Sequence, residues 1–151
     1  MALNIVLIEP EIPNNTGNIG RLSLASGATL HLVKPLGFEL DDKRVKRAGL
    51  DYWQHIDLKI YESSEAFFKE HSDKKMVFLS SHGEQNYWDI PHQENMFYVF
   101  GKESVGLSKE ILENQKQSLF KIPIFNENIR SLNLANSVGI IIYDAIKSLS
   151  K

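Results

Sequence analysis

Three short segments of this 151-residue chain concentrate residue types that bind ligands. Residues 15–21 combine an amide at Asn15, a glycine at position 17 and a guanidinium at Arg21. Residues 101–106 place two glycines around the carboxylate of Glu103, and residues 131–137 carry four short Ser and Asn side chains. A guanidinium binds anionic oxygen, while short polar side chains satisfy several ligand hydrogen bonds. The three segments together favour a site for a polar ligand.

Each segment, considered alone, also has a purely structural interpretation. The first fits a capped helix that carries a solvated arginine. The second fits an ordinary strand-to-helix turn with exposed charges, and the third fits a helix start with more capping residues than it needs. Both interpretations of each segment therefore stay open on composition and spacing.

Other sequence signals are weaker. Lys43, Arg44, Lys46 and Arg47 form a basic cluster suited to phosphate, but the flanking aspartates favour a solvated charged helix over a phosphate site. The five histidines share no metal-ligand spacing, so we expect no metal. No Walker A loop is present, and Gly17-Asn18-Ile19-Gly20 lacks the leading glycine of the dinucleotide fingerprint, which leaves a Rossmann nucleotide site poorly supported.

The elements that would position these residues alternate along the chain. Short apolar runs predict strands over 5–8, 30–33, 56–60, 76–80, 96–100 and 119–122. Periodic stretches predict helices from 16 to 27, over 41–49, from 63, from 108, and from 131 to the C-terminus. Alternation of this kind predicts an α/β sheet packed with helices, in which ligands bind beyond the carboxyl ends of strands.

Bulk properties bound the possible functions. The length predicts one domain over residues 1–151, and a formal charge of −2 excludes a generally basic coat, so a polyanion must be held by a local patch. Without cysteine there is neither a disulfide framework nor a thiolate zinc site. The N-terminus does not resemble a secretion signal, and no apolar run approaches the roughly 20 residues that span a bilayer. We therefore expect a soluble cytoplasmic protein without membrane contact.

Taken together, the three segments resemble the signatures of the SPOUT superfamily of RNA methyltransferases. Asn15, Gly17 and Arg21 match an Asn-x-Gly-x-x-x-Arg element, and residues 101–106 match Gly-x-Glu-x-x-Gly. Ile122-Pro123 followed by residues 131–137 matches the third element, Ile-Pro … Ser-Leu-Asn-Leu-x-Asn-Ser. All three in order form a specific pattern.

Further similarity narrows the resemblance to the small stand-alone members, the tRNA (cytidine/uridine-34) 2′-O-methyltransferases. Residues 9–13, 35–38, 41–44 and 48–52 carry it, so it spans almost the whole chain. It implies methylation of the wobble ribose of leucine tRNAs by a homodimer. It also implies a deep trefoil knot within a mostly parallel sheet with helices on both faces, whereas general rules of connectivity favour an unknotted sheet.

The resemblance implies a role for each matching residue. Residues 76–151 would form the knot and hold S-adenosylmethionine, which leaves as S-adenosylhomocysteine, with no metal. The implied cofactor-binding residues are Leu79, Gly101, Gly106, Ile122, Ser131 and Leu132. Arg21 would act at the reaction centre, with Asn15, Glu103, Ser131 and Asn133 positioning it and the ribose. The implied RNA-binding residues are Lys43, Arg44, Lys46, Arg47, Arg130 and Tyr143.

Related enzymes are thought to use the arginine as a general base. A guanidinium is nearly always protonated, so we expect Arg21 to anchor phosphate and stabilise the developing alkoxide. The competing hypotheses are a 2′-O-methyltransferase for another tRNA position or ribosomal RNA, a non-catalytic RNA-binding module, and, more distantly, a Rossmann-type nucleotide enzyme.

Overall fold

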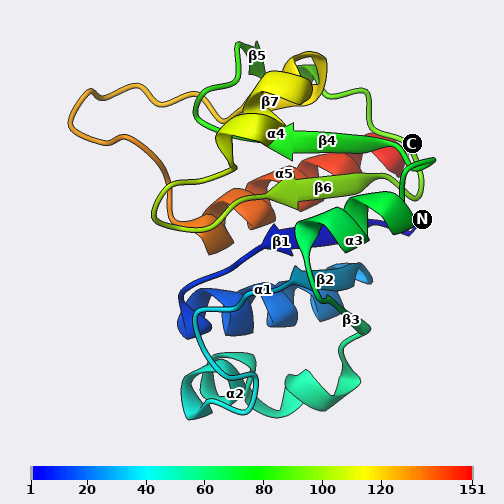
Figure 1. Cartoon of the computed structure of the whole chain (residues 1–151), viewed down its shortest axis with the longest axis vertical. Coiled ribbons are helices and arrows are strands. Elements are labelled where there is room, and N and C mark those ends of the chain that lie inside the picture. The colour runs from blue at the N-terminus through cyan, green and yellow to red at the C-terminus, as the bar shows by residue number, and fades with distance from the viewer. Residues whose placement is uncertain (1, 151) are drawn as a thin grey trace.

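The computed structural model describes residues 2–150, except for the side chains at 46 and 48–51. Figure 1 shows a sheet flanked by helices. The strands are β1 (Asn4–Ile8), β2 (Thr29–Val33), β3 (Leu58–Tyr61), β4 (Met76–Leu79), β5 (Gln85–Asn86), β6 (Phe97–Phe100) and β7 (Leu119–Lys121). The α-helices are α1 (Pro13–Ser26), α2 (Lys43–Gly49), α3 (Ser64–Glu70), α4 (Lys109–Asn114) and α5 (Leu134–Leu149). Short 3₁₀ turns are η1 (Leu50–His55), η2 (Tyr87–Asp89) and η3 (Lys116–Ser118).

The strands form one sheet in the order β3-β2-β1-β6-β4-β7-β5, and every strand pair is parallel. Strands β2 and β3 lie on one side of β1. Strands β6, β4, β7 and β5 lie on its other side, with β6 next to β1. The boundary between β1 and β6 is therefore a topological switch point, where connections leave toward opposite faces and ligands commonly bind. The predicted parallel α/β class is confirmed.

Alternating side chains divide the core into two layers. Ile5 and Leu7 of β1 point to one face, where they join Ile19 of α1 and Ile141 of α5. Val6 and Ile8 point to the other face, which α3 and α4 cover through residues such as Phe67 and Leu112. A parallel sheet buried on both faces needs continuous apolar strands, which explains the short unbroken runs in the sequence. Helices on both faces are confirmed.

Two helix starts differ from the sequence prediction. Helix α1 begins at Pro13, three residues earlier than expected, because proline suits the first helical position, where no N–H is needed. Gly17 consequently lies buried in the second turn of the helix. Helix α5 begins at Leu134, so residues 131 and 132 belong to the preceding loop and Asn133 is the N-cap.

Other boundaries agree more closely with expectation. Ser63 and Ser108 cap α3 and α4 by accepting the backbone N–H groups of Ala66 and Ile111. Gly27 ends α1 at a positive φ of 75°, a conformation that favours glycine.

Among the helices of residues 2–150, none is long and apolar enough to cross a membrane. The threading of a trefoil knot stays a prediction from the resemblance.

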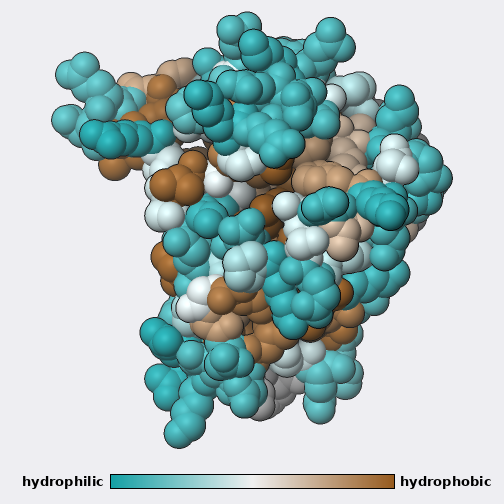
Figure 2. Space-filling view, viewed as in Figure 1, coloured by the Kyte–Doolittle hydropathy of each residue, from teal (hydrophilic) through white to brown (hydrophobic). Residues whose placement is uncertain are grey.

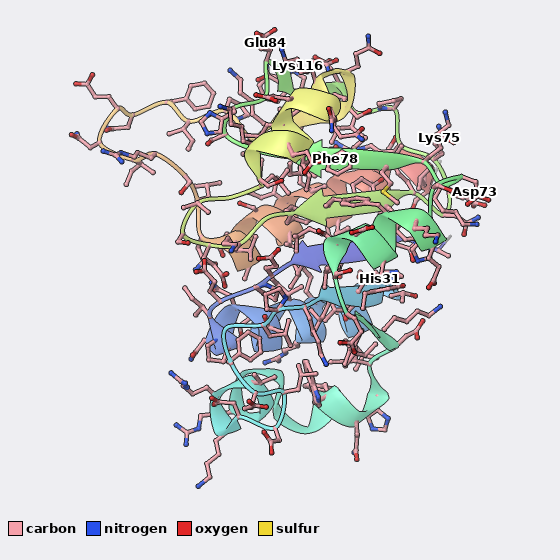
Figure 3. All side chains as sticks on the ribbon, viewed as in Figure 1. His31, Asp73, Lys75, Phe78, Glu84 and Lys116 are labelled. Carbon is pink, nitrogen blue, oxygen red and sulfur yellow. The ribbon has the colours of Figure 1, made fainter. Side chains whose placement is uncertain are left out.

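A buried histidine network lies on the face covered by α3. His31 on β2, labelled in Figure 3, is hydrogen-bonded at both ring nitrogens. Nδ1 bonds to the Tyr61 hydroxyl at 2.8 Å, and Nε2 bonds to the Asn4 amide oxygen at 2.8 Å. Because an amide oxygen only accepts, the nitrogen facing Asn4 carries the proton and the Tyr61 hydroxyl donates to the other. Burial, with a smaller contribution from nearby His71, lowers the pKa of His31 to about 4.

Candidate functional site

The loops that follow β1 and β6 are held together by reciprocal contacts at the switch point. The Glu103 carboxylate accepts the backbone N–H groups of Glu11 at 2.8 Å and Ile12 at 3.0 Å. In return, the Glu11 carboxylate accepts the backbone N–H of Ser104 at 2.8 Å, a bond that, with help from the charge of Lys102, lowers the pKa of Glu11. The two loops therefore form one unit.

Asn15 connects this unit to the segment before α5. Its side-chain N–H donates to Glu103 at 3.2 Å, and its amide oxygen accepts from the Asn133 side chain at 3.1 Å. Asn15 is only 6% exposed, so both partners fix its orientation in a largely dry environment. The oxygen of Asn133 meanwhile caps α5 by accepting from Ala135 and Asn136. One hydrogen-bonded chain, Glu103–Asn15–Asn133, thus joins the three segments that the sequence singled out.

The tight turn after β6 explains its two glycines. A Cβ added to Gly101 would lie 2.3 Å from the backbone of Gly106, so only glycine fits there. Gly106 has a positive φ of 71° and donates its N–H to the Lys102 carbonyl at 2.9 Å. Residues 101–106 therefore form a closed turn, from which the Glu103 carboxylate reaches the loop after β1. Contact of Glu103 with a ligand stays a prediction.

Arg21 lies on the exposed side of α1, and its position depends on an aromatic residue that the sequence analysis did not select. The Cζ atom of Arg21 sits 5.3 Å from the centre of the Tyr52 ring, within the range of a cation–π interaction. Within the described residues, no hydrogen bond joins Arg21 to Asn15, Glu103 or Asn133. The signal for Tyr52 was present in the 48–52 segment that carried the resemblance, but only packing of η1 on α1 brings the ring to Arg21.

The residues expected to hold the cofactor gather at the ends of three adjacent strands. Leu79 ends β4, Gly101 follows β6 and Ile122 follows β7, and β4 lies between the other two strands. Leu79 is level with Phe100 and Phe120, and Ile122 packs against the same core cluster. Ser131 and Leu132 are exposed on the loop before α5, whereas Gly106 is on the turn after β6. Apolar side chains beside backbone polar groups at strand ends fit a flat heterocycle such as adenine.

A groove of about 870 Å³ lies next to the hydrogen-bonded chain, between α1 and the beginning of α5. Its polar lining includes Asn15 and Asn133, and its apolar lining includes Leu22, Leu132 and Ile140. Of the expected cofactor residues, only Leu132 belongs to this lining. The groove is therefore distinct from the strand-end cluster, although the two share an edge.

The expected RNA contacts lie on separate surfaces. Lys43, Arg44 and Arg47 are exposed on α2, and Arg44 pairs with Asp42 at 3.1 Å, as the flanking acidic residues suggested. The side chain of Lys46 lies outside the described residues. Arg130 is exposed on the loop before α5, and Tyr143 is 46% exposed on α5. In the described part of the chain, no cluster of His, Asp and Glu could hold a metal ion.

Comparison with known proteins gives consistent matches. A model of the SpoU rRNA methylase family matches residues 2–143. A protein of Saccharophagus degradans named tRNA (cytidine(34)-2′-O)-methyltransferase is 43% identical over 147 residues, which cover 97% of this chain and 95% of that protein.

Two solved structures extend the comparison. One, described as "Structural insights into the 2-OH methylation of C/U34 on tRNA", superposes with a TM-score of 0.93 at 42% identity, covering 99% of this chain and 97% of that one. An AdoMet-bound rRNA methyltransferase from Sinorhizobium meliloti gives a TM-score of 0.88 at 25% identity, covering 98% of this chain and 57% of that one.

Proposed function

This chain belongs to the SpoU rRNA methylase family, and on that premise we propose that it transfers a methyl group from S-adenosylmethionine to the ribose 2′-hydroxyl of nucleotide 34, a cytidine or modified uridine, in tRNA. Leucine tRNAs are the proposed substrates. The observation that carries this proposal is the hydrogen-bonded chain Glu103–Asn15–Asn133, which joins all three signature segments. Its central residue, Asn15, lies on α1, the helix that also carries Arg21. The names of relatives such as the Saccharophagus degradans protein support nucleotide 34 as the target.

Arg21 acts on the substrate through its permanent charge. Its guanidinium holds the phosphate next to the target ribose and stabilises the 2′-oxygen as that oxygen loses its proton. A group that stays protonated is a poor general base, so Arg21 serves as an electrostatic catalyst. Tyr52 restricts the motion of the guanidinium from one side, which keeps the charge where the oxygen will be.

Asn15, Glu103, Asn133 and Ser131 orient the reacting groups. When bound, S-adenosylmethionine supplies a methyl group already activated on a sulfonium, so the chemistry needs no metal. The residues that would hold it are Leu79, Gly101, Gly106, Ile122, Ser131 and Leu132. Alignment of reactants can contribute about 7–11 kcal/mol of barrier lowering. The rigid backbone around Gly101 and the cap at Asn133 supply that alignment.

We further infer that two copies of the chain pair through the face made by α1 and α5. Leu22 and Gly139, both half-buried, and the exposed Ile140 line the groove there together with asparagines, and Tyr143 continues the exposed surface along α5. Partly exposed apolar residues on two packed helices are typical of a surface that another protein covers. Pairing gives the nearly neutral protein two basic clusters, each with Lys43, Arg44, Lys46 and Arg47, to hold tRNA phosphates in the cytoplasm.

Methyl transfer to purified tRNA tests the function. The wild-type protein, incubated with tritiated S-adenosylmethionine and tRNA, should produce a 2′-O-methylated nucleotide at position 34. Arg21→Ala should lose most of this activity, about 100-fold or more, in the range seen when a transition-state donor is removed. Lys69→Ala, an exposed cation on α3 at the opposite face, is the matched control and should retain activity.

The location of the methyl group decides between the competing functions. Modification of ribosomal RNA, but not tRNA, would replace this substrate with another RNA. A methylated base would exclude 2′-O-methylation altogether. No transfer to any RNA by the wild type would leave a non-catalytic RNA-binding module.

A further inference from the structure

The segment between β7 and α5 projects from the body of the molecule. Figure 1 shows it as a long loop, in orange, that leaves the sheet and returns to α5. Every residue from 125 to 133 is exposed. Its ends are nevertheless fixed, because Lys121 pairs with Asn86 in the sheet and Asn133 is bonded to Asn15. We call residues 124–132 the projecting loop.

The projecting loop carries an unusual amount of exposed apolar surface. Phe125 is 90% exposed and Ile129 is 53% exposed, although they flank a turn that two hydrogen bonds close. In that turn Asn126 accepts the backbone N–H groups of Asn128, at 2.9 Å, and Ile129, at 3.2 Å. Figure 2 shows brown surface on this projection among teal. A phenylalanine left in water on an ordered turn forgoes the burial that normally stabilises such a side chain.

Other exposed apolar residues accompany Phe125 on this loop and on the turn after β6. Leu132, 38% exposed, ends the loop beside Asn133, and Val105, 72% exposed, lies on the turn that Glu103 ties to the same hydrogen-bonded chain. Single exposed apolar residues need no explanation, but four on two connected loops do. Arg130 adds a cation to the same loop. An exposed apolar ring and an exposed guanidinium on the same loop match a nucleotide, which has a flat base and an anionic phosphate.

We propose that Phe125 stacks on an unpaired base of the RNA substrate, while Arg130 contacts an adjoining phosphate. This inference rests on the proposed function, because an anticodon loop presents unpaired bases close to nucleotide 34. Proteins recognise single-stranded RNA by stacking its bases on aromatic side chains and arginine. Glu127 is the one carboxylate of the projecting loop; it occupies the turn between Asn126 and Asn128, two residues after Phe125 and three before Arg130. Phe125 is not among the residues that line the groove assigned above to a second copy.

Binding of a synthetic anticodon stem-loop, measured by fluorescence anisotropy with the full-length protein, tests the stacking. Phe125→Ala should raise Kd by about 5- to 150-fold, the range for loss of one base–aromatic stack. Phe125→Trp should retain the wild-type Kd, because it keeps a flat ring. Trp88→Ala is the matched control, since Trp88 is 56% exposed on η2. For a fully paired RNA duplex, wild type and Phe125→Ala should bind equally.

Several results would overturn the stacking. Equal stem-loop affinities for wild type and Phe125→Ala would do so, as would an absence of stem-loop binding by the wild type. If light scattering shows that Phe125→Ala turns a dimer into a monomer, the ring is covered by a second copy and not by RNA. Methyl transfer separates this inference from the proposed function: in an active enzyme, Phe125→Ala should raise KM for tRNA and leave kcat unchanged. An inactive wild type that still binds the stem-loop through Phe125 refutes the function but keeps the stacking.

Discussion

Replacing Glu103 by glutamine perturbs the contact that joins the loops after β1 and β6. One carboxylate oxygen accepts from the Glu11 N–H, and the other accepts from both Ile12 and Asn15. A glutamine has one oxygen and one NH₂ group, so it keeps most bonds by turning its oxygen toward Ile12 and Asn15. The NH₂ group then faces the Glu11 N–H, and one partly buried donor loses its acceptor.

The expected loss of stability follows from that one bond. A hydrogen bond to a charged group contributes about 1.5–3 kcal/mol, so Glu103→Gln should destabilise the protein by about 2 kcal/mol. For a chain of this size, that corresponds to a Tm lower by about 4–8 °C. Glu103→Ala removes all three bonds, so it should lower Tm further and also release Asn15.

Thermal unfolding followed by circular dichroism measures these shifts, and methyl transfer measured in parallel reports on the site. Glu103→Gln should retain much of the activity, because Asn15 keeps its acceptor, whereas Glu103→Ala should lose considerably more. Glu113→Gln, an exposed position on α4, is the control for removal of a carboxylate and should leave Tm unchanged. A Tm for Glu103→Gln equal to that of the control would refute the role assigned to the carboxylate.

Three further predictions concern other parts of the molecule. Tyr52→Phe should retain the activity that depends on Arg21, whereas Tyr52→Ala should lower kcat several-fold. Steady-state kinetics measure both variants. Equal kcat values for the two would show that the ring does not hold the guanidinium. Burial favours neutral His31, so the contribution of this residue to the free energy of unfolding is complete above about pH 6.5. That contribution should be lost as the pH falls toward about 4, at a cost of up to about 3 kcal/mol. Denaturant unfolding across this range should show the decline, and constant stability would contradict it. Asn133→Ala should lower the free energy of unfolding by about 1 kcal/mol, because it removes the α5 cap. Asn133→Ser should restore the cap but not the bond to Asn15. A kcat that falls in Asn133→Ala would show that the bond to Asn15 matters in addition to capping. Unchanged stability in Asn133→Ala would contradict both roles.

Much of the fold was predictable from local pattern. The short apolar runs located six of the strands to within two residues, because strands buried on both faces must be apolar throughout. Ser63 and Ser108 marked helix starts, and Gly27 marked a helix end, through side-chain or backbone chemistry that acts within one turn. The brief strand β5 was missed, since Gln85 and Asn86 have no apolar signal.

The helix boundaries near the site were harder to predict. The polar run 131–137 suggested an early start for α5, yet only Asn133 serves as the cap and the two residues before it are loop. Competition among several capping residues is decided by where the chain must turn to reach Asn15, and that position depends on the sheet. The early start of α1 at Pro13 was missed for a different reason: proline suits the first helical position, but Ile12 before it offers no capping side chain to mark the start.

By itself, the sequence determined the α/β class, the three segments that carry the site and the family to which they belong. The tertiary structure decided how these segments meet: Glu103 accepts from the backbone of the loop after β1, Asn15 bridges to Asn133, and Tyr52 packs beside Arg21. The reason is physical. Propensity, capping and apolar periodicity act over a few residues, whereas these contacts join residues 31 to 118 positions apart. Only the order of strands in the sheet and the packing of η1 on α1 bring such residues into contact.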